Sequence, residues 1–243
     1  MRRITKWFIL VAIIVPIAVQ GTWSYAAGWP RSWNRADWSS TGTLPPAAAN
    51  HDAMVRIYAA RSGRWKGIFA VHHWIVVKPA GGAYSRYEVV GWGRPVRHNK
   101  YAPDARWYSN QPNVVHEVRG SKAESLIPLI TSAVADYEWQ AHGSYSVWPG
   151  PNSNTFVAHV LRQVPELAAE MDPAGIGKDY LGPGLAVAPT PSGTGWQVSL
   201  WGLAGAAIAL REGIEMHILG TTVGIDFDDF GIKLPGIGRL GAS

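Results

Sequence analysis

The segment FAVHHWIVVKPAGGAYSRYEVVGWG, residues 69–93, decides the fold. Its two halves are dense in β-branched and aromatic residues, and they predict strands over 69–77 and 86–92. The glycines between them predict a short turn, so the two strands should pair antiparallel. A similar composition predicts further strands at 55–62 and 113–118. The segments 69–77, 86–92 and 113–118 together predict one antiparallel sheet.

Two helices are expected after these strands. In residues 121–139 the apolar residues recur at spacings of three and four, as in an amphipathic helix: Leu126, Ile130, Val134 and Tyr137. Ser121 with Glu124 predicts a capping box at the start of this helix. A second helix is predicted over 154–171. The expected fold class is therefore α+β, with the antiparallel sheet packed against two helices.

The N-terminus has the pattern of a membrane anchor. Three basic residues lie within the first six positions, and no further charge follows until Arg31. A helix over 7–29 would be about 34 Å long, which is enough to cross a hydrocarbon layer of about 30 Å. Because flanking basic residues stay in the cytoplasm, we expect an inner-membrane protein with a cytoplasmic N-terminus and a periplasmic domain. A signal peptide cleaved after the small residues at 24–26 is the alternative.

Composition divides the chain into four segments. Residues 1–29 form the signal anchor or signal peptide, and residues 30–50, rich in Pro, Ser and Ala, predict a linker. The predicted sheet and helices lie within 51–182. Residues 183–243 are Gly-rich and apolar, and glycine at that density disfavours a helix. This last segment therefore predicts β structure, with a membrane-embedded hairpin at 197–210 as the alternative.

The residue content excludes several kinds of site. The chain has no cysteine, which excludes disulfides, thiolate metal sites and a cysteine nucleophile. The formal charge of +5 is scattered without a basic tract, so we expect no nucleic-acid partner. His217 and Glu215 lie two residues apart, and we interpret them as a solvated strand face rather than a metal pair. No metal and no cofactor are expected.

The segment PGPNSNTFVAHVL, residues 149–161, places Ser153 where the second helix begins. A helix N-terminus offers unpaired N–H groups and a partial positive charge, and there the N–H of a serine can help bind an oxyanion. A serine nucleophile also needs an adjacent base. His72 on the first strand is the candidate base, and Glu88 on the next strand can orient it. A plain capping role for Ser153 is the alternative.

These segments resemble the circularly permuted papain-like group, which includes NlpC/P60-type peptidases and lecithin–retinol acyltransferase-like enzymes. The resemblance spans roughly residues 68–165 and rests on HHWI at 72–75 and NSNTFV at 152–157. It implies a papain-like α+β domain with Ser153, His72 and Glu88 at the catalytic positions. Serine replaces the cysteine of that group, which implies weak or lost activity. Five further residues are expected to bind a ligand in the cleft: His73, Trp74, Trp148, Asn152 and Asn154.

The chain as a whole more closely resembles an uncharacterised proteobacterial envelope family, domain of unknown function 3750. The segments that carry this resemblance are VHHWIVVKPAG, RYEVVGWG, WPGPNSNTFVAHVL and KLPGIGR. That family implies no known activity, so two functions stay open. The expected one is a membrane-anchored protein whose cleft binds peptide, glycan or lipid. The alternative is a serine-nucleophile hydrolase or acyltransferase that acts on amide or ester bonds of the cell envelope. Either way the expected partners are the inner membrane and a cell-wall or lipid ligand.

Overall fold

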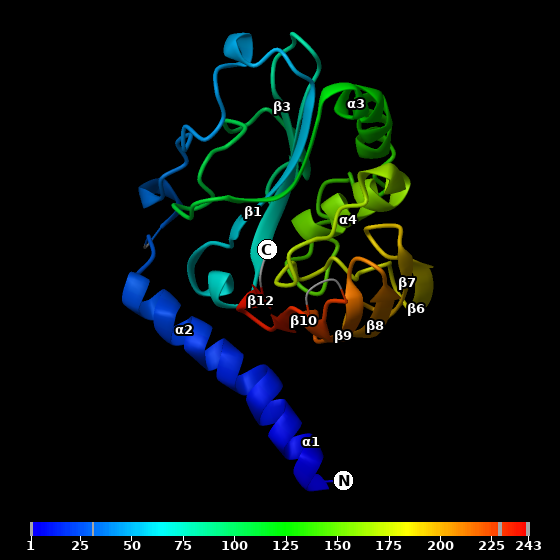
Figure 1. Ribbon diagram of the computed structural model, residues 1–243. Coiled ribbons are helices and arrows are strands. Elements are labelled where there is room, and N and C mark those ends of the chain that lie inside the picture. Colours follow the sequence, from blue (N-terminus) through cyan, green and yellow to red (C-terminus); the bar gives the residue numbers. More distant parts are fainter. Residues whose placement is uncertain (1, 31, 228–229, 242–243) are drawn as a thin grey trace.

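A computed structural model describes residues 2–30, 32–227 and 230–241 of the chain. A long N-terminal helix extends from a body made of two sheets and two helices (Figure 1). This helix runs without a break through α1, the π-helical segment η1 and α2: Arg2–Ile9, Leu10–Ile14 and Val15–Ala27. The segment Lys6–Ala27 is long and apolar enough to cross a membrane, and almost none of it is buried against the body.

The first sheet has five antiparallel strands in the order β4-β3-β2-β1-β5. Their bounds are β1 Met54–Arg61, β2 Val71–Lys78, β3 Ser85–Val89, β4 Val96–His98 and β5 Asn113–Arg119. The predicted strands are confirmed, and so is the antiparallel pairing of β2 with β3. The sheet also contains β1, which lies between β2 and β5 and pairs antiparallel with both. The β2–β3 pairing covers only Ile75–Val77 of β2. The first half of β2, which carries both histidines, therefore has an edge that is not paired with β3.

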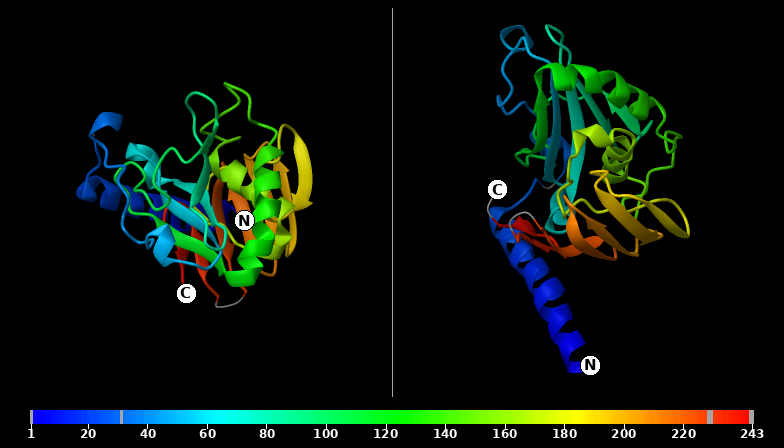
Figure 2. Two further views of the ribbon diagram at one scale, coloured as in Figure 1. Left: turned by 90° about the horizontal axis from the view of Figure 1, so that it is seen from above. Right: turned by 45° about the vertical axis from the view of Figure 1, so that its right-hand side comes forward.

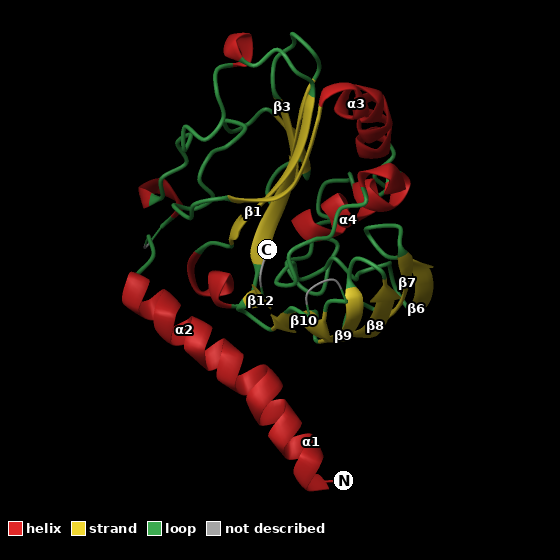
Figure 3. Cartoon of the chain, viewed as in Figure 1, coloured by secondary structure: helices red, strands yellow, loops and turns green. Residues whose placement is uncertain are grey.

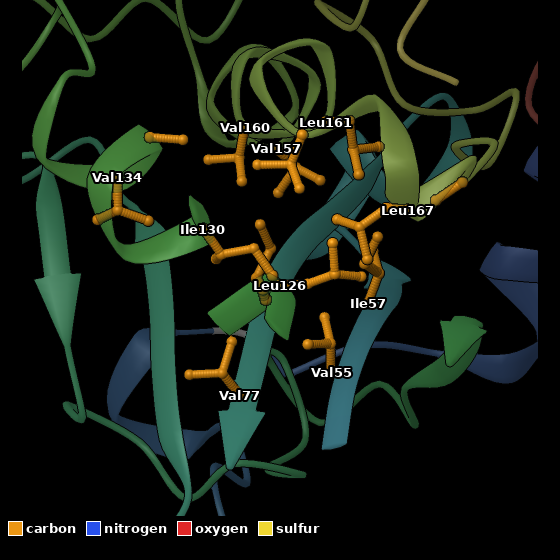
Figure 4. Close-up of a cluster of buried hydrophobic side chains, with 14 of the residues drawn as sticks. Val55, Ile57, Val77, Leu126, Ile130, Val134, Val157, Val160, Leu161 and Leu167 are labelled. Atoms are coloured by element: carbon orange, nitrogen blue, oxygen red, sulfur yellow. The ribbon is translucent and has the colours of Figure 1, made fainter. Parts of the chain in front are cut away.

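Helices α3 (Gly120–Ala135) and α4 (Ser153–Gln163) cover one face of this sheet (Figure 3). The apolar stripe of each helix packs on the inward side chains of β1 and β2, and together they form the main core (Figure 4). The side chains that Figure 4 labels come from both helices and both strands, among them Ile57, Val77 and Leu161, and from the short 3-10 turn after α4, which contributes Leu167. This packing sets the position of the α4 N-terminus beside β2.

Two details of the predicted helices are wrong. The Ser121–Glu124 capping box does not form, because α3 begins at Gly120 with Arg119 as N-cap and no side-chain cap. Glu124 Oε2 instead accepts a hydrogen bond from the backbone N–H of Ala80 and ties α3 to the β2–β3 turn. The second helix ends at Gln163 rather than at 171, because the proline that follows two residues later cannot continue the helical hydrogen bonding.

The other face of the first sheet has its own core, built on Tyr58, Trp74 and Trp107. The segment predicted as a linker packs on it, with Trp38 and Leu44 against this core. The carboxylate of Asp104 fastens the same segment by accepting hydrogen bonds from four residues: Ser40, Thr41, Thr43 and Leu44. The two short 3-10 turns of this segment are η2 Trp33–Arg35 and η3 Ala47–Ala49. Residues 32–50 therefore belong to the packed body.

The Gly-rich C-terminal region forms a second sheet of seven antiparallel strands that follow one another in sequence order. They are β6 Leu185–Pro189, β7 Gly195–Leu200, β8 Ala204–Ala209, β9 Gly213–Ile218, β10 Thr221–Ile225, β11 Ile232–Leu234 and β12 Gly238–Leu240. This confirms the predicted β structure, and residues 197–210 fall in the β7–β8 hairpin. Figure 2 shows the sheet on the side of the body from which the N-terminal helix extends.

The inner face of the second sheet buries a network of charges. Glu215 pairs with Lys178 at 2.7 Å and with Lys233 at 2.9 Å, and Lys233 also pairs with Asp226 at 2.7 Å. His217, beside Glu215, is 3% exposed and Glu215 is 1% exposed. The interpretation of His217 and Glu215 as a solvated face was therefore wrong. Polar and apolar residues do alternate along β9, but its polar side faces inward.

Candidate functional site

A cavity of about 1040 Å³ lies where the beginning of β2, the α4 N-terminus and the N-terminal helix come together. Its wall is mainly aromatic and aliphatic: Ile13, Ile17, Trp33, Trp65, Phe69, Trp92, Trp107, Tyr145, Trp148, Ile176, Ile218 and Leu219. Polar residues face the same space: Ser32, Ser62, Arg64, Lys66, His72, Asn152, Ser153, Asn154 and Thr221. Apolar walls with a few polar groups are the usual form of a small-molecule site. The sequence-predicted residues Ser153 and His72 therefore share one cavity.

Glu88 holds the ring of His72. The Nε2 atom of His72 lies 3.0 Å from Oε2 of Glu88, and the same oxygen accepts a hydrogen bond of 2.8 Å from Nη2 of Arg86. All three side chains are buried. Burial works to raise the pKa of Glu88, but the hydrogen bond from His72 and the charge of Arg86 outweigh it and lower the pKa. Glu88 is therefore ionised and accepts a hydrogen bond from the N–H group at His72 Nε2.

The tautomer of His72 follows from this contact. Because Nε2 carries the proton that points to Glu88, the lone pair of the neutral ring lies on Nδ1. The ring stacks flat on Trp107, with centroids 3.5 Å apart and planes 3° apart, which fixes its orientation. Burial lowers the pKa of His72 despite the opposing effect of Glu88. His72 is thus a neutral imidazole with a free acceptor at the wall of the cavity.

Asn152 caps α4 and leaves Ser153 free. The side-chain oxygen of Asn152 accepts hydrogen bonds from the N–H groups of Asn154 and Thr155, and Thr155 Oγ1 accepts from the N–H of Asn152. Ser153 is the first residue of the helix and is 4% exposed. Within the described part of the chain, neither its N–H nor its hydroxyl makes a hydrogen bond. The cap thus satisfies the neighbouring donors and leaves the two donors of Ser153 for a ligand.

Asn154 joins α4 to the edge of β2 that is not paired with β3. Its Oδ1 accepts hydrogen bonds from Nδ1 of His73 at 2.8 Å and from the N–H of His73 at 3.3 Å. Its Nδ2 donates to the carbonyl oxygens of Val71 and Ile176 at 3.0 and 2.7 Å. This carboxamide takes the place of a neighbouring strand, so Asn154 and the fully buried His73 position the helix. Burial lowers the pKa of His73 to about 4.

The other two predicted binding residues have different surroundings. Trp148 lines the cavity, and its Nε1 donates a hydrogen bond of 2.8 Å to the carbonyl oxygen of Leu219 in the turn after β9. Trp74 is fully buried, and its Nε1 donates to the carbonyl oxygen of Pro103. Trp74 therefore belongs to the core beneath His72.

Sequence reasoning missed four residues of this site. Arg86 lies two positions before Glu88 on the same strand face, and this i, i+2 spacing of opposite charges could have predicted their ion pair. Trp107 reaches His72 from a loop far along the chain, and the local pattern gave no signal for it. Ile13 and Ile17 line the cavity from the N-terminal helix. The pattern of that helix indicated a membrane segment and gave no reason to place it at the site.

No curated protein and no solved structure matches the chain. Residues 52–180 match the family described as "Protein of unknown function (DUF3750)". The matched segment contains the whole first sheet, both helices, His72, Glu88 and Ser153. It covers more than half of the chain. The chain therefore belongs to this family of uncharacterised proteins.

Proposed function

We propose that the chain is a membrane-anchored protein of the proteobacterial envelope that binds a lipid acyl chain in the cavity beside His72. The helix Lys6–Ala27 serves as an uncleaved anchor in the inner membrane, with the N-terminus in the cytoplasm and the body in the periplasm. The observation that carries the proposal is the cavity itself, because its apolar wall includes Ile13 and Ile17 of the anchor helix.

The composition of the wall favours a lipid over a peptide or a glycan. Aromatic and aliphatic side chains make up most of it, and an acyl chain gains about 0.8 kcal/mol for each methylene buried against such a surface. A glycan or peptide would leave most of its polar groups without partners there, which costs free energy. Because Ile13 and Ile17 belong to a segment that lies in the bilayer, an acyl chain can enter the cavity from the membrane.

The polar end of the cavity suits the ester or carboxyl group of such a lipid. Ser153 offers an unpaired N–H and a hydroxyl at the start of α4, where the helix dipole favours negative charge. The Nδ1 atom of His72 can accept a hydrogen bond from a hydroxyl group of the lipid. A lipid with a carbonyl oxygen at Ser153 and a hydroxyl at His72 would satisfy these groups.

A photoreactive lipid tests this proposal. A phospholipid with a diazirine in its acyl chain, incorporated into vesicles with the full-length protein, should cross-link to residues of the cavity wall such as Trp107 and Tyr145. Val147→Trp would fill the cavity from a side chain that lines it and is 53% exposed. It should abolish these cross-links. Leu129→Trp on α3, at a site 46% exposed, is the matched control and should keep them. Cross-links confined to the anchor helix would disprove the proposal.

The alternative is that Ser153 is a nucleophile that cleaves or transfers the acyl group. In that reaction Nδ1 of His72 accepts the hydroxyl proton of Ser153 as Oγ forms a bond to the carbonyl carbon. The Ser153 N–H donates to the oxyanion, and His72 returns the proton to the leaving alcohol or amine. Two observations support this candidate. Ser153 and His72 line one cavity, and the residues lie on a helix and two neighbouring strands: Ser153 on α4, His72 on β2 and Glu88 on β3. The resemblance to the permuted papain-like group supports it as well.

A fluorophosphonate probe distinguishes the two candidates. Covalent labelling of the wild-type protein that is lost in both Ser153→Ala and His72→Ala would support the enzyme. No labelling of a protein that still cross-links the lipid would support binding alone. We expect the second result, because within the described residues no hydrogen bond joins the Ser153 hydroxyl to His72.

A further inference from the structure

The second sheet has its polarity reversed. An antiparallel sheet with one solvated face ordinarily turns its apolar side inward and its polar side to water. Here β9 buries Glu215 and His217 and exposes Ile214, Met216 and Ile218. The buried side cannot take those apolar residues instead, because it is filled by the ion pairs that Glu215 makes with two lysines.

The exposed side is apolar across the whole sheet. Strand pairing puts Val187 opposite Val198 and Trp196 opposite Ile208. It then puts Ile208 opposite Ile214, and Ile214 opposite Ile225. Residues directly opposite one another share a face. The pair Val187–Val198 and the row Trp196–Ile208–Ile214–Ile225 therefore lie on one face of the sheet, and neither contains a charged residue. Val187 is 65% exposed and Ile208 is 60% exposed. An apolar face of this extent marks an interaction surface.

The sheet stands beside the anchor helix. A Cβ atom added to Gly236, in the β11–β12 turn, would lie 3.5 Å from the Cβ atom of Gln20. Gln20 precedes Ala27, the last residue of the apolar segment, by about 10 Å along the helix axis. The β11–β12 turn therefore lies beside the apolar segment and not beyond its C-terminal end. Ile218 and Leu219 at the β9–β10 turn line the same cavity as Ile13 and Ile17. Figures 1 and 2 show the sheet on the side from which the helix extends.

We propose that the exposed face of the second sheet, strands β6 to β10, lies on the hydrocarbon of the membrane that the N-terminal helix enters. The helix fixes the height of the sheet, and the exposed apolar side chains of strands β6 to β10 supply an uncharged contact surface. This inference rests on the proposed anchoring and is independent of the ligand proposed for the cavity.

The contact is shallow. The outer edges of β6 and β12 are not paired within the described part of the sheet, and open sheet edges do not occur inside hydrocarbon. The sheet therefore lies along the bilayer surface with its apolar side chains inserted, in the manner of interfacial segments that reach about 5–10 Å deep. The height set by Gln20 agrees with that depth.

Single-cysteine variants test the contact cleanly, because the chain has no cysteine of its own. A nitroxide is attached to Val187→Cys or Ile208→Cys on the sheet. Val19→Cys on the helix and Leu129→Cys on α3 are the controls. The last two sites are 55% and 46% exposed. The full-length variants are reconstituted in vesicles of phosphatidylethanolamine and phosphatidylglycerol. Collisions of each label with oxygen, which concentrates in hydrocarbon, are compared with collisions with a water-soluble nickel chelate.

The sheet labels should resemble the helix label, with oxygen collisions exceeding nickel collisions, and the α3 label should show the reverse. Sheet labels that match the α3 label while the helix label reports hydrocarbon would overturn the inference and leave the anchoring intact. A helix label that reports water would overturn both. Sheet labels shielded from oxygen and nickel alike would show a protein, such as a second copy of the chain, on this face and would also overturn it.

Discussion

His72 and Glu88 form a buried pair in which the ring Nε2 lies 3.0 Å from the carboxylate Oε2 and Arg86 binds the same oxygen. The pair joins neighbouring strands of the first sheet, and it decides which nitrogen of His72 is free. The Nδ1 atom of His72 and the donors of Ser153 belong to residues that line one cavity, whose wall is mainly aromatic and aliphatic. The chemistry available to a ligand follows from this one contact.

Replacing Glu88 by alanine should destabilise the protein strongly. The change leaves the guanidinium of Arg86 buried without its partner, and breaking a buried pair in this way costs about 3–5 kcal/mol. Chemical denaturation of the detergent-solubilised protein, followed by tryptophan fluorescence, measures the loss. Asp37→Ala is the control, because its pair with Arg106 is exposed, and it should leave the free energy of unfolding nearly unchanged. Equal effects of the two substitutions would contradict the role given to Glu88.

Asn152, and not Ser153, should carry the stability of the α4 N-terminus. Asn152→Ala removes the cap and two further bonds from Nδ2, to the carbonyl oxygens of Val147 and Ile176. We expect a loss of about 2 kcal/mol, at the upper end of the range for caps. Ser153→Ala should change the unfolding free energy by less than about 0.5 kcal/mol, because its hydroxyl makes no hydrogen bond among the described residues. The reverse order of effects would show that Ser153 is the structural residue.

Glu215→Ala should detach the second sheet from the body. It leaves Lys178 and Lys233 buried without the carboxylate that both contact, and the expected cost is again about 3–5 kcal/mol. Burial works to raise the pKa of Glu215, but Lys178, His217 and Lys233 outweigh it and hold the pKa at about 2. Glu166→Ala, at an exposed carboxylate, is the control. Limited proteolysis should cut the Glu215→Ala protein first within 183–241, and an uncut C-terminal region would contradict this account.

Stability should fall in mild acid. Burial lowers the pKa of His73 from its ordinary 6.5 to about 4, so between these values the unfolded chain binds a proton that the folded protein does not. The contribution is complete above pH 6.5 and is lost as the pH falls toward 4, and the two pKa values correspond to about 3 kcal/mol. The Tm measured from pH 7 to pH 4 should therefore decrease. His73→Gln should have a shallower decrease, and an unchanged slope would show that His73 is not the group that titrates.

Much of the first sheet and its helices could be predicted because the signals are local. Strand composition around His72 and the helical spacing of Leu126 and Ile130 depend only on nearby residues. The position of Ser153 at a helix start could be predicted for the same reason. The Ser121–Glu124 pattern predicted a capping box that does not form, because the Glu124 carboxylate accepts a hydrogen bond from the β2–β3 turn, which is distant in sequence.

The rest depended on tertiary packing. Trp107 and the N-terminal helix reach the cavity from distant parts of the chain, and no local spacing predicts that contact. In the second sheet the alternation around Glu215 was visible, but a period of two shows only that the faces differ. Which face is buried was decided by Lys178 and Lys233, which approach from outside β9 and make the polar side the inner one.

Native mass spectrometry of the full-length protein released from lipid nanodiscs tests the central claim, that the cavity holds an acyl lipid, most directly. The account predicts that the wild-type chain, Ser153→Ala and Leu129→Trp each retain one such lipid after the bulk lipid is stripped. Val147→Trp, whose indole would occupy the cavity, should retain none. A wild-type chain that carries no lipid, or a Val147→Trp chain that retains as much as the wild type, would contradict the account.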